Sequence, residues 1–151
     1  MMSEKPRLAL VVSRFNEGIT RGLLQGAKDY LKEKGIVVAA SDLFDAPGAF
    51  EIPLIAQTLA RTKNYAGVIC LGCVIKGDTA HFELISLGAT VGIMRSSLDT
   101  GVPISFGILT TYTDEQAEKR SRSNAENKGR EAASACLETV LLLQKIKAGS
   151  A

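Results

Sequence analysis

The only histidine of the chain, His81, directly follows a turn that can bind an anion. The turn has the sequence Gly-Asp-Thr-Ala at 77–80 and comes after an apolar run at 68–75. A helix that begins at such a turn presents free backbone N–H groups and the positive end of its dipole to a phosphate. The same dipole disfavours an imidazolium ion, and a neutral imidazole is suited to general acid–base catalysis. Because a lone histidine is also commonly structural, a catalytic role depends on its surroundings.

The same turn differs from the nucleotide-binding P-loop at one decisive position. The P-loop pattern places a lysine where this chain has Asp78. That lysine neutralises nucleotide phosphates, whereas a carboxylate repels them. Val74 and Ile75 also belong to a predicted strand rather than to a loop. The sequence therefore argues against an NTPase and leaves a site for a single phosphate at Gly77, Asp78 and Thr79.

Two further loops carry side chains with more than one interpretation. Phe15 follows an apolar run at 8–12, where it either closes the top of the core or offers its face to a flat ring. Glu51 follows a Pro-Gly turn, in the first turn of a predicted helix. A carboxylate there is commonly a helix-start acid, because the helix dipole favours it. Beside exposed backbone N–H groups, it can equally bind a chain of hydroxyl groups.

The cysteines argue against a metal or redox centre. Cys70 and Cys73 form a C-x-x-C pair, the third cysteine is Cys136, and no second pair is present. The pair lies inside the apolar run at 68–75, which is predicted to be a buried strand. Residues three apart on a strand point to opposite faces, so they share neither a metal ion nor a disulfide. The three thiols are therefore expected in the core.

Composition and charge describe a globular protein outside the nucleic-acid-binding and membrane classes. The 151 residues fit one domain, 46% of them are hydrophobic and 23% charged, and the net charge is only +2. Nucleic acid is not an expected partner, because no basic run lies beside aromatic residues. The longest apolar stretch, 67–75, is far shorter than the ~20 residues that span a bilayer. The start of the chain has no signal-peptide pattern, so the expected location is the cytoplasm.

Four apolar, β-branched runs alternate with helical patterns. Continuous apolar character is typical of strands covered on both faces, and the predicted strands are 8–12, 36–40, 68–75 and 103–110. The helices predicted between them are 19–34, 53–62 and 80–98. In the last of these, Gly88 and Gly92 suggest close packing against a neighbour. This order predicts a single α/β domain over 1–151, a three-layer α/β/α fold of flavodoxin-like type with a four-stranded parallel sheet. Ligands of such folds bind beyond the carboxyl ends of the strands.

The last third of the chain is predicted to be helical, with two separate starts. Thr113 and Gln116 fit one capping box, and Ser123 and Glu126 fit a second, so a break is expected near 121–123. The final helix is predicted to end before Gly149. Its expected buried stripe is Ala132, Cys136, Thr139, Leu143 and Ile146.

The same region holds a cluster of charges. Such a cluster on helices is usually a solvated face, yet its cations can also contact an anion or a carbonyl group. Arg120 and Lys128 are candidates, and Glu131 lies three residues after Lys128. The residues alone do not choose among Lys119, Arg120, Arg122, Lys128 and Arg130.

Five blocks of this sequence resemble, in the same order, the lumazine synthase family. They are Val-Val-Ser-Arg-Phe-Asn (11–16), Pro-Gly-Ala-Phe-Glu-Ile-Pro (47–53), Leu-Gly-Cys-Val-Ile-Lys-Gly-Asp-Thr-Ala-His-Phe-Glu (71–83), Pro-Ile-Ser-Phe-Gly-Ile-Leu-Thr-Thr (103–111) and Asn-Lys-Gly-x-Glu-Ala-Ala (127–133). The third block is the most specific. The resemblance implies a reaction that joins 5-amino-6-(ribitylamino)uracil to 3,4-dihydroxy-2-butanone 4-phosphate. The products would be 6,7-dimethyl-8-ribityllumazine, phosphate and water, and no cofactor or metal would be used.

The resemblance also implies a role for each site residue. His81 would shuttle protons with the help of Glu131, and Phe15 would stack on the pyrimidine ring. The ribityl chain would be held by Ala49, Phe50 and Glu51. The pyrimidine edge would be held by backbone groups of Val74 and Ile75. The phosphate would be received by Gly77, Asp78, Thr79 and Arg120.

A further implication of the resemblance is a site built between subunits. Phe106, Arg120 and Lys128 would reach it from a neighbouring copy, and the expected assembly is a homopentamer. The segment before the first predicted strand is short, which favours a free pentamer over an icosahedral shell. An association with riboflavin synthase is also implied. This chain departs from the family where Arg122 and Glu126 replace glycines, so Arg122 is an alternative to Arg120 as the phosphate ligand.

Two other functions compete with the enzyme. A non-catalytic flavin- or pterin-binding module on the same scaffold would bind ligand without turnover. A phosphoacceptor signalling domain would need clustered acids at the end of the first strand, where this chain has Arg14, Phe15 and Asn16. The second alternative is therefore discounted.

Overall fold

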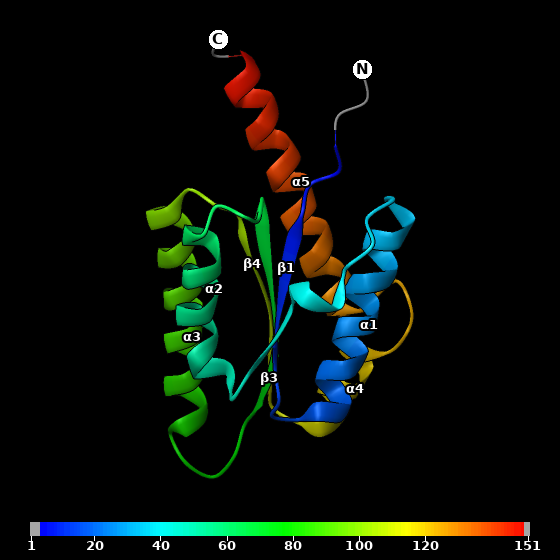
Figure 1. Cartoon of the computed structure of the whole chain (residues 1–151). Helices are drawn as coiled ribbons and strands as arrows, with labels where there is room; N and C mark the ends of the chain where they lie inside the picture. The colour runs from blue at the N-terminus through cyan, green and yellow to red at the C-terminus, as the bar shows by residue number, and fades with distance from the viewer. Residues whose placement is uncertain (1–3, 150–151) are drawn as a thin grey trace.

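A parallel sheet covered by helices on both faces forms the molecule (Figure 1), in a computed structural model that describes residues 4–149. The strands are β1 (Leu8–Ser13), β2 (Leu43–Ala46), β3 (Gly67–Ile75) and β4 (Ile104–Thr111), in the order β2-β1-β3-β4. On one face lie α2 (Ile52–Arg61) and α3 (His81–Thr100), and on the other lie α1 (Glu17–Glu33), α4 (Asp114–Ser121) and α5 (Lys128–Gly149). Two 3₁₀ turns, η1 (Ala40–Asp42) and η2 (Ala49–Glu51), flank β2. The predicted three-layer α/β/α fold with four parallel strands is confirmed.

The two faces of the sheet bury separate apolar layers. Every residue of β1 is buried, as are the first seven residues of β3. Leu10 packs toward α1 and α5, whereas its neighbour Val11 packs toward α2 and α3. This arrangement explains the continuous apolar character of the central strands, because neither face of them meets water. Within residues 4–149, no helix combines the length and apolarity that crossing a membrane requires.

The prediction of the second strand was wrong. Residues 36–39 form no regular element, and β2 begins only at Leu43. Ile36 is buried under α1, but Val37 is 85% exposed. The real strand contains the exposed Asp45, since β2 lies at the edge of the sheet and is only partly covered. Its start is held by Asp42, which accepts hydrogen bonds from Arg7 (Nη2, 2.7 Å) and from the Tyr65 hydroxyl (3.0 Å). The bonds from Arg7 lower the pKa of this carboxyl.

The two predicted helix starts in the last third have different outcomes. The first is confirmed, because the Gln116 N–H donates to Thr113 Oγ1 (3.1 Å) and Gln116 Oε1 accepts from the Tyr112 N–H (2.8 Å). The second is wrong, because α5 begins only at Lys128. Its first turn is capped by Asn127, whose Oδ1 accepts from the Arg130 N–H at 3.0 Å. A break between two helices is present, but it extends over 122–127.

The far end of α5 departs from the predicted buried stripe. Ala132 and Cys136 are buried as expected, whereas Thr139 is exposed and Ile146 is 57% exposed. Thr139 is exposed because Val140, next to it, faces the core instead. The C-terminal turns of α5 rise past the ends of the strands (Figure 1), which leaves the last part of the helix exposed. The helix ends at Gly149, within a residue of its predicted end.

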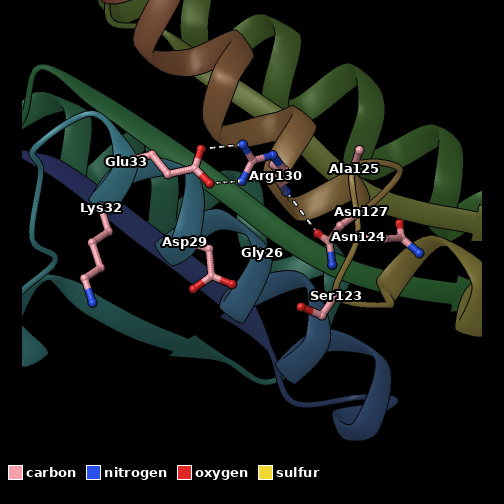
Figure 2. Close-up of a pocket in the computed structure, with 9 residues that line it drawn as sticks. All are labelled: Gly26, Asp29, Lys32, Glu33, Ser123, Asn124, Ala125, Asn127 and Arg130. Carbon is pink, nitrogen blue, oxygen red and sulfur yellow. Dashed lines mark hydrogen bonds and ion pairs between the residues drawn. The ribbon is translucent and has the colours of Figure 1, made fainter.

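Asn127 joins three segments at the centre of the helical face. Its side chain is 1% exposed, and its Nδ2 donates to the carbonyls of Gly22 on α1 (3.0 Å) and of Arg122 after α4 (2.9 Å). A Cβ on Gly26 would lie 2.0 Å from Asn127 Oδ1, so only glycine fits there. Figure 2 shows the hydrogen bond between Arg130 and Asn127 beside the ion pair of Glu33 and Arg130.

Asn127→Ala should lower the free energy of unfolding by about 3 kcal/mol, because two carbonyls and one N–H group lose their partner inside the protein. The matched control is Asn124→Ala, an exposed asparagine of the same loop, which should cost about 0.5 kcal/mol. Urea unfolding at a fixed protomer concentration measures both values. Equal transition midpoints for the two variants would contradict the role assigned to Asn127.

Candidate functional site

A cavity of about 370 Å³ lies at the carboxyl ends of β1 and β3. Seven of the predicted site residues line it: Phe15, Ala49, Phe50, Glu51, Val74, Ile75 and His81. Asn16, Gly48, Cys73 and Ile85 complete the lining. The residues come from three loops that are far apart in sequence. The sheet therefore brings them together at the edge where open parallel folds bind ligands.

The ring of Phe15 belongs to the cavity and not to the core. It is 69% exposed, which excludes the alternative that it closes the top of the apolar interior. Its backbone N–H donates to Ser13 Oγ at 3.3 Å. The next residue, Asn16, adopts the left-handed conformation (φ 57°) and donates from Nδ2 to the Cys73 carbonyl at 3.0 Å. This bond ties the loop after β1 to the end of β3.

Close packing around Gly48 brings an aromatic ring and a carboxylate to the same place. A Cβ on Gly48 would lie 3.1 Å from Glu51 Oε1 and 3.4 Å from Phe15 Cδ2. Both side chains are exposed, and Glu51 immediately precedes α2. Behind them, Phe50 packs on α3, where a Cβ on Gly88 would lie 3.2 Å from its ring. Gly88 was predicted to allow such an approach, and this is confirmed.

His81 is the first residue of α3, one residue after the predicted start at residue 80 and within the first turn as expected, and it faces water rather than the core. Its N–H donates to Thr79 Oγ1 at 3.3 Å. Gly77, Asp78 and Thr79 are exposed and lie before it in the turn, outside the residues that line the cavity. The imidazole thus lies between a cavity with an aromatic wall and a turn with free N–H groups. That placement suits an acid–base residue acting on a bound molecule.

The remaining predicted residues line a different cavity. Phe106, Arg120, Lys128 and Glu131 surround a space of about 300 Å³ along the outer edge of β4. Arg120 Nη1 donates to the Gln116 carbonyl at 3.0 Å, and Lys128 Nζ lies 2.7 Å from Glu131 Oε2. Within one chain, these residues do not share the cavity of His81. Arg122 lines neither of these cavities. It lies in a third cleft, which shares Asn16 and Ile75 with the cavity of His81.

A larger cavity of about 720 Å³ lies between α1 and the connection from α4 to α5 (Figure 2). It contains none of the predicted site residues, and the contacts of Asn127, Glu33 and Arg130 on its wall are those that hold the helices together. Size therefore does not identify the candidate site. We assign the site to the smaller cavity at the sheet edge because it holds the convergent aromatic, acidic and imidazole groups.

The cysteines have the structural role that was predicted. Cys70 and Cys73 lie in the two different apolar layers, on opposite faces of β3. Burial raises the pKa of Cys73 to about 11 and that of Cys70 further. Among residues 4–149, no cluster of histidine, cysteine and acidic side chains could hold a metal ion.

The family model described as 6,7-dimethyl-8-ribityllumazine synthase matches residues 5–144. The chain belongs to this family. A lumazine synthase relative from Caulobacter vibrioides, named 6,7-dimethyl-8-ribityllumazine synthase 1, is 66% identical over 142 residues, which cover 94% of this chain and 93% of the relative. The 6,7-dimethyl-8-ribityllumazine synthase of Salinibacter ruber is 51% identical over 141 residues, which cover 93% of this chain and 90% of the relative.

Arg122 is one of the two positions at which we expected this chain to depart from other lumazine synthases. Arg122 follows α4 with φ −69° and ψ 155°. Any residue adopts this conformation, so the arginine causes no backbone strain. Arg120, rather than Arg122, shares a cavity with Lys128.

Some cavity residues were missed by sequence reasoning. Asn16 could have been found, because asparagine is one of the few residues that readily adopts the left-handed conformation needed at a sharp turn. Ile85 and the carbonyl of Cys73 gave no signal, since they appear in the sequence as ordinary core positions.

Proposed function

We propose that this chain condenses 5-amino-6-(ribitylamino)uracil with 3,4-dihydroxy-2-butanone 4-phosphate to give 6,7-dimethyl-8-ribityllumazine, phosphate and water. The observation that supports it best is the cavity that Phe15, Glu51 and His81 share at the sheet edge. Its volume of about 370 Å³ suits a small organic substrate. Membership of the family described as 6,7-dimethyl-8-ribityllumazine synthase supports the product, and the substrates are those that the resemblance implies.

The ribitylaminouracil would occupy the wall made by Phe15 and the end of β3. Its pyrimidine ring would stack on Phe15, and its edge would bond to backbone groups of Val74 and Ile75. The ladder between β1 and β3 ends at Val12 and Leu71, so the last residues of β3 have only β4 as a partner strand. Their backbone groups on the other side are therefore open to a ligand.

The ribityl chain would run toward η2. Ala49, Phe50 and Glu51 lie there, and the carboxylate of Glu51 can accept hydrogen bonds from several hydroxyl groups. Because Gly48 brings Phe15 and Glu51 together, the ring and the sugar-like chain of one substrate can contact both at once. Glu51 would thus have a binding role and not only that of a helix-start acid.

The phosphate of the second substrate would lie at Gly77, Asp78 and Thr79, at the start of α3. The amine of the uracil would attack the ketone and form an imine with loss of water, and His81 would accept and return the protons. Phosphate would then leave, stabilised by the turn and by Arg120 from a neighbouring copy. The nitrogen that carries the ribityl chain would then attack the remaining carbonyl, and ring closure with loss of a second water would complete the product. Addition, elimination and proton transfer suffice for this sequence without net oxidation, so the proposal invokes no cofactor.

The second half of the site would come from another copy of the chain. Phe106, Arg120 and Lys128 line their own cavity at the open edge of β4, where a neighbour can reach it. Glu131 is bonded to Lys128, so it would assist His81 only from the same neighbouring copy. We propose that the single domain over 1–151 assembles as a free homopentamer in the cytoplasm, with an association with riboflavin synthase. The number of copies follows from the resemblance to lumazine synthases.

An apolar stripe along α3 supports self-association. Five large side chains, spaced three and four residues apart, are each more than half exposed: Leu84, Leu87, Val91, Met94 and Leu98. This spacing places them on one side of the helix. Contiguous apolar surface of this kind marks an interface in a globular protein.

His81→Ala should lower kcat about 100-fold at unchanged fold, because proton transfer loses its acid–base group. Arg120→Ala should instead raise the KM of the phosphorylated substrate. Arg122→Ala is the matched control and should leave that KM unchanged. The assay follows formation of the fluorescent lumazine. Folded parent protein that binds the amine substrate tightly without product would favour the non-catalytic binding module.

Leu87→Glu combined with Val91→Glu should reduce the particle mass in solution, because two charges would be buried in the proposed interface. Val37→Glu, at an 85% exposed apolar residue outside the stripe, should leave the mass unchanged. Sedimentation velocity measures all three proteins. A parent particle of monomer mass, or an unchanged mass in the double variant, would contradict the assembly through α3.

A further inference from the structure

The turn at 77–80 has few contacts that fix its position. All four of its residues are exposed, and a Cβ on Gly77 would meet nothing within 4 Å. Its start is anchored by the Lys76 N–H, which donates to the Thr111 carbonyl at 2.9 Å. Its end is anchored by the bond from the His81 N–H to Thr79 at 3.3 Å. The path between these anchors depends on the side chains that flank the turn.

The ring of Tyr112 contacts both flanks of this turn. Lys76 Nζ lies 5.6 Å from the ring centroid, within the range of a cation–π contact. The ring of Phe82 lies on the other flank, with centroids 5.9 Å apart and planes inclined by 47°. Lys76 also lies 4.0 Å from Glu83, so the residues before and after the turn are joined a second time.

Tyr112 itself is held by the rigid part of the fold. It directly follows β4, and its N–H donates to Gln116 Oε1 at 2.8 Å in the cap of α4. Its side chain is 66% exposed, so the ring contributes little to the core. The ring contacts residues at both ends of a turn that has few other contacts. It therefore restricts the backbone conformations that this turn can adopt.

We propose that Tyr112 is a positioning residue for the phosphate turn. Its ring holds Lys76 and Phe82 at a fixed separation, and this sets the direction of the N–H groups of 77–79 and the place of His81. The inference rests on the proposed function, because it assumes that the turn receives the phosphate of the second substrate. The uracil substrate would bind at Phe15 and Glu51, in a cavity that Tyr112 does not line, so the two substrates should respond differently.

The test compares Tyr112→Ala with Tyr112→Phe. The alanine variant should raise the KM of the phosphorylated substrate and the inhibition constant of inorganic phosphate about tenfold, the size that two exposed aromatic contacts allow. The KM of the uracil substrate should stay within about twofold, and the phenylalanine variant should behave as the parent. No rise for the phosphorylated substrate, or an equal rise for both substrates, would overturn the role of Tyr112.

Tyr30→Ala is the matched control, because this ring also faces cations, Lys34 and Arg130, on the opposite side of the sheet. It should leave both KM values unchanged. Hydrogen exchange of the peptide that contains 76–82 gives a readout independent of activity, and it should be faster in Tyr112→Ala and unchanged in Tyr30→Ala. An inactive parent protein with faster exchange in Tyr112→Ala would contradict the proposed function and leave the contact role of Tyr112 supported. Unchanged exchange would contradict the contact role even in an active protein.

Discussion

The candidate site depends on the hydrogen bond from Asn16 to the Cys73 carbonyl, which joins the loop after β1 to the end of β3. There, β1 turns away after Ser13, while β3 continues to Ile75. In a parallel sheet covered on both faces, this offset leaves backbone groups of the longer strand without a partner strand on one side. The bond satisfies one of them and fixes the loop of Phe15 beside the others. The position of the Phe15 ring and the unpaired backbone groups of β3 therefore both result from the offset between the ends of β1 and β3.

The buried layers keep this edge rigid. The side chains of β1 and β3 fill both faces of the sheet, and α3 approaches η2 through Gly88 and α2 through Gly92. A Cβ on Gly92 would lie 2.7 Å from Pro53, so the glycine is needed for space. The position of Phe50 and of η2 follows from this close contact. Binding residues on short loops are thus placed by the packing of the elements behind them.

Much of this arrangement could be predicted from the sequence, because strong local signals and tertiary packing agree. The central strands, the start of α3 to within one residue, and the opposite faces of Cys70 and Cys73 follow from the residue pattern. The edge strand could not be predicted, because the apolar run at 36–40 is a better strand pattern than Leu43–Ala46. Its place is fixed instead by the distant contacts of Asp42. The start of α5 was misplaced for a similar reason, since Asn127 caps the helix while bonding to α1.

Because the candidate site residues lie in two separate cavities, self-association would be needed to bring them together around one substrate. One cavity holds the imidazole and the aromatic wall, and the other holds the cations of Arg120 and Lys128. The five blocks that resemble the family include His81, Phe15 and Lys128 but not Arg120. The residue pattern of one chain does not show that the two groups lie in different cavities. On the proposed assembly, neither half is complete without a neighbour, and the apolar stripe of α3 lies in the interface that brings the halves together.

Co-assembly of two impaired variants tests this division most directly. His81→Ala and Arg120→Ala subunits are refolded together in equal amounts and assayed below the KM of the parent protein. If each site takes His81 from one copy and Arg120 from its neighbour, random mixing restores about a quarter of the parent activity. If both residues serve the same site within one chain, the mixture shows only the average of the two variants, and the intersubunit site is contradicted.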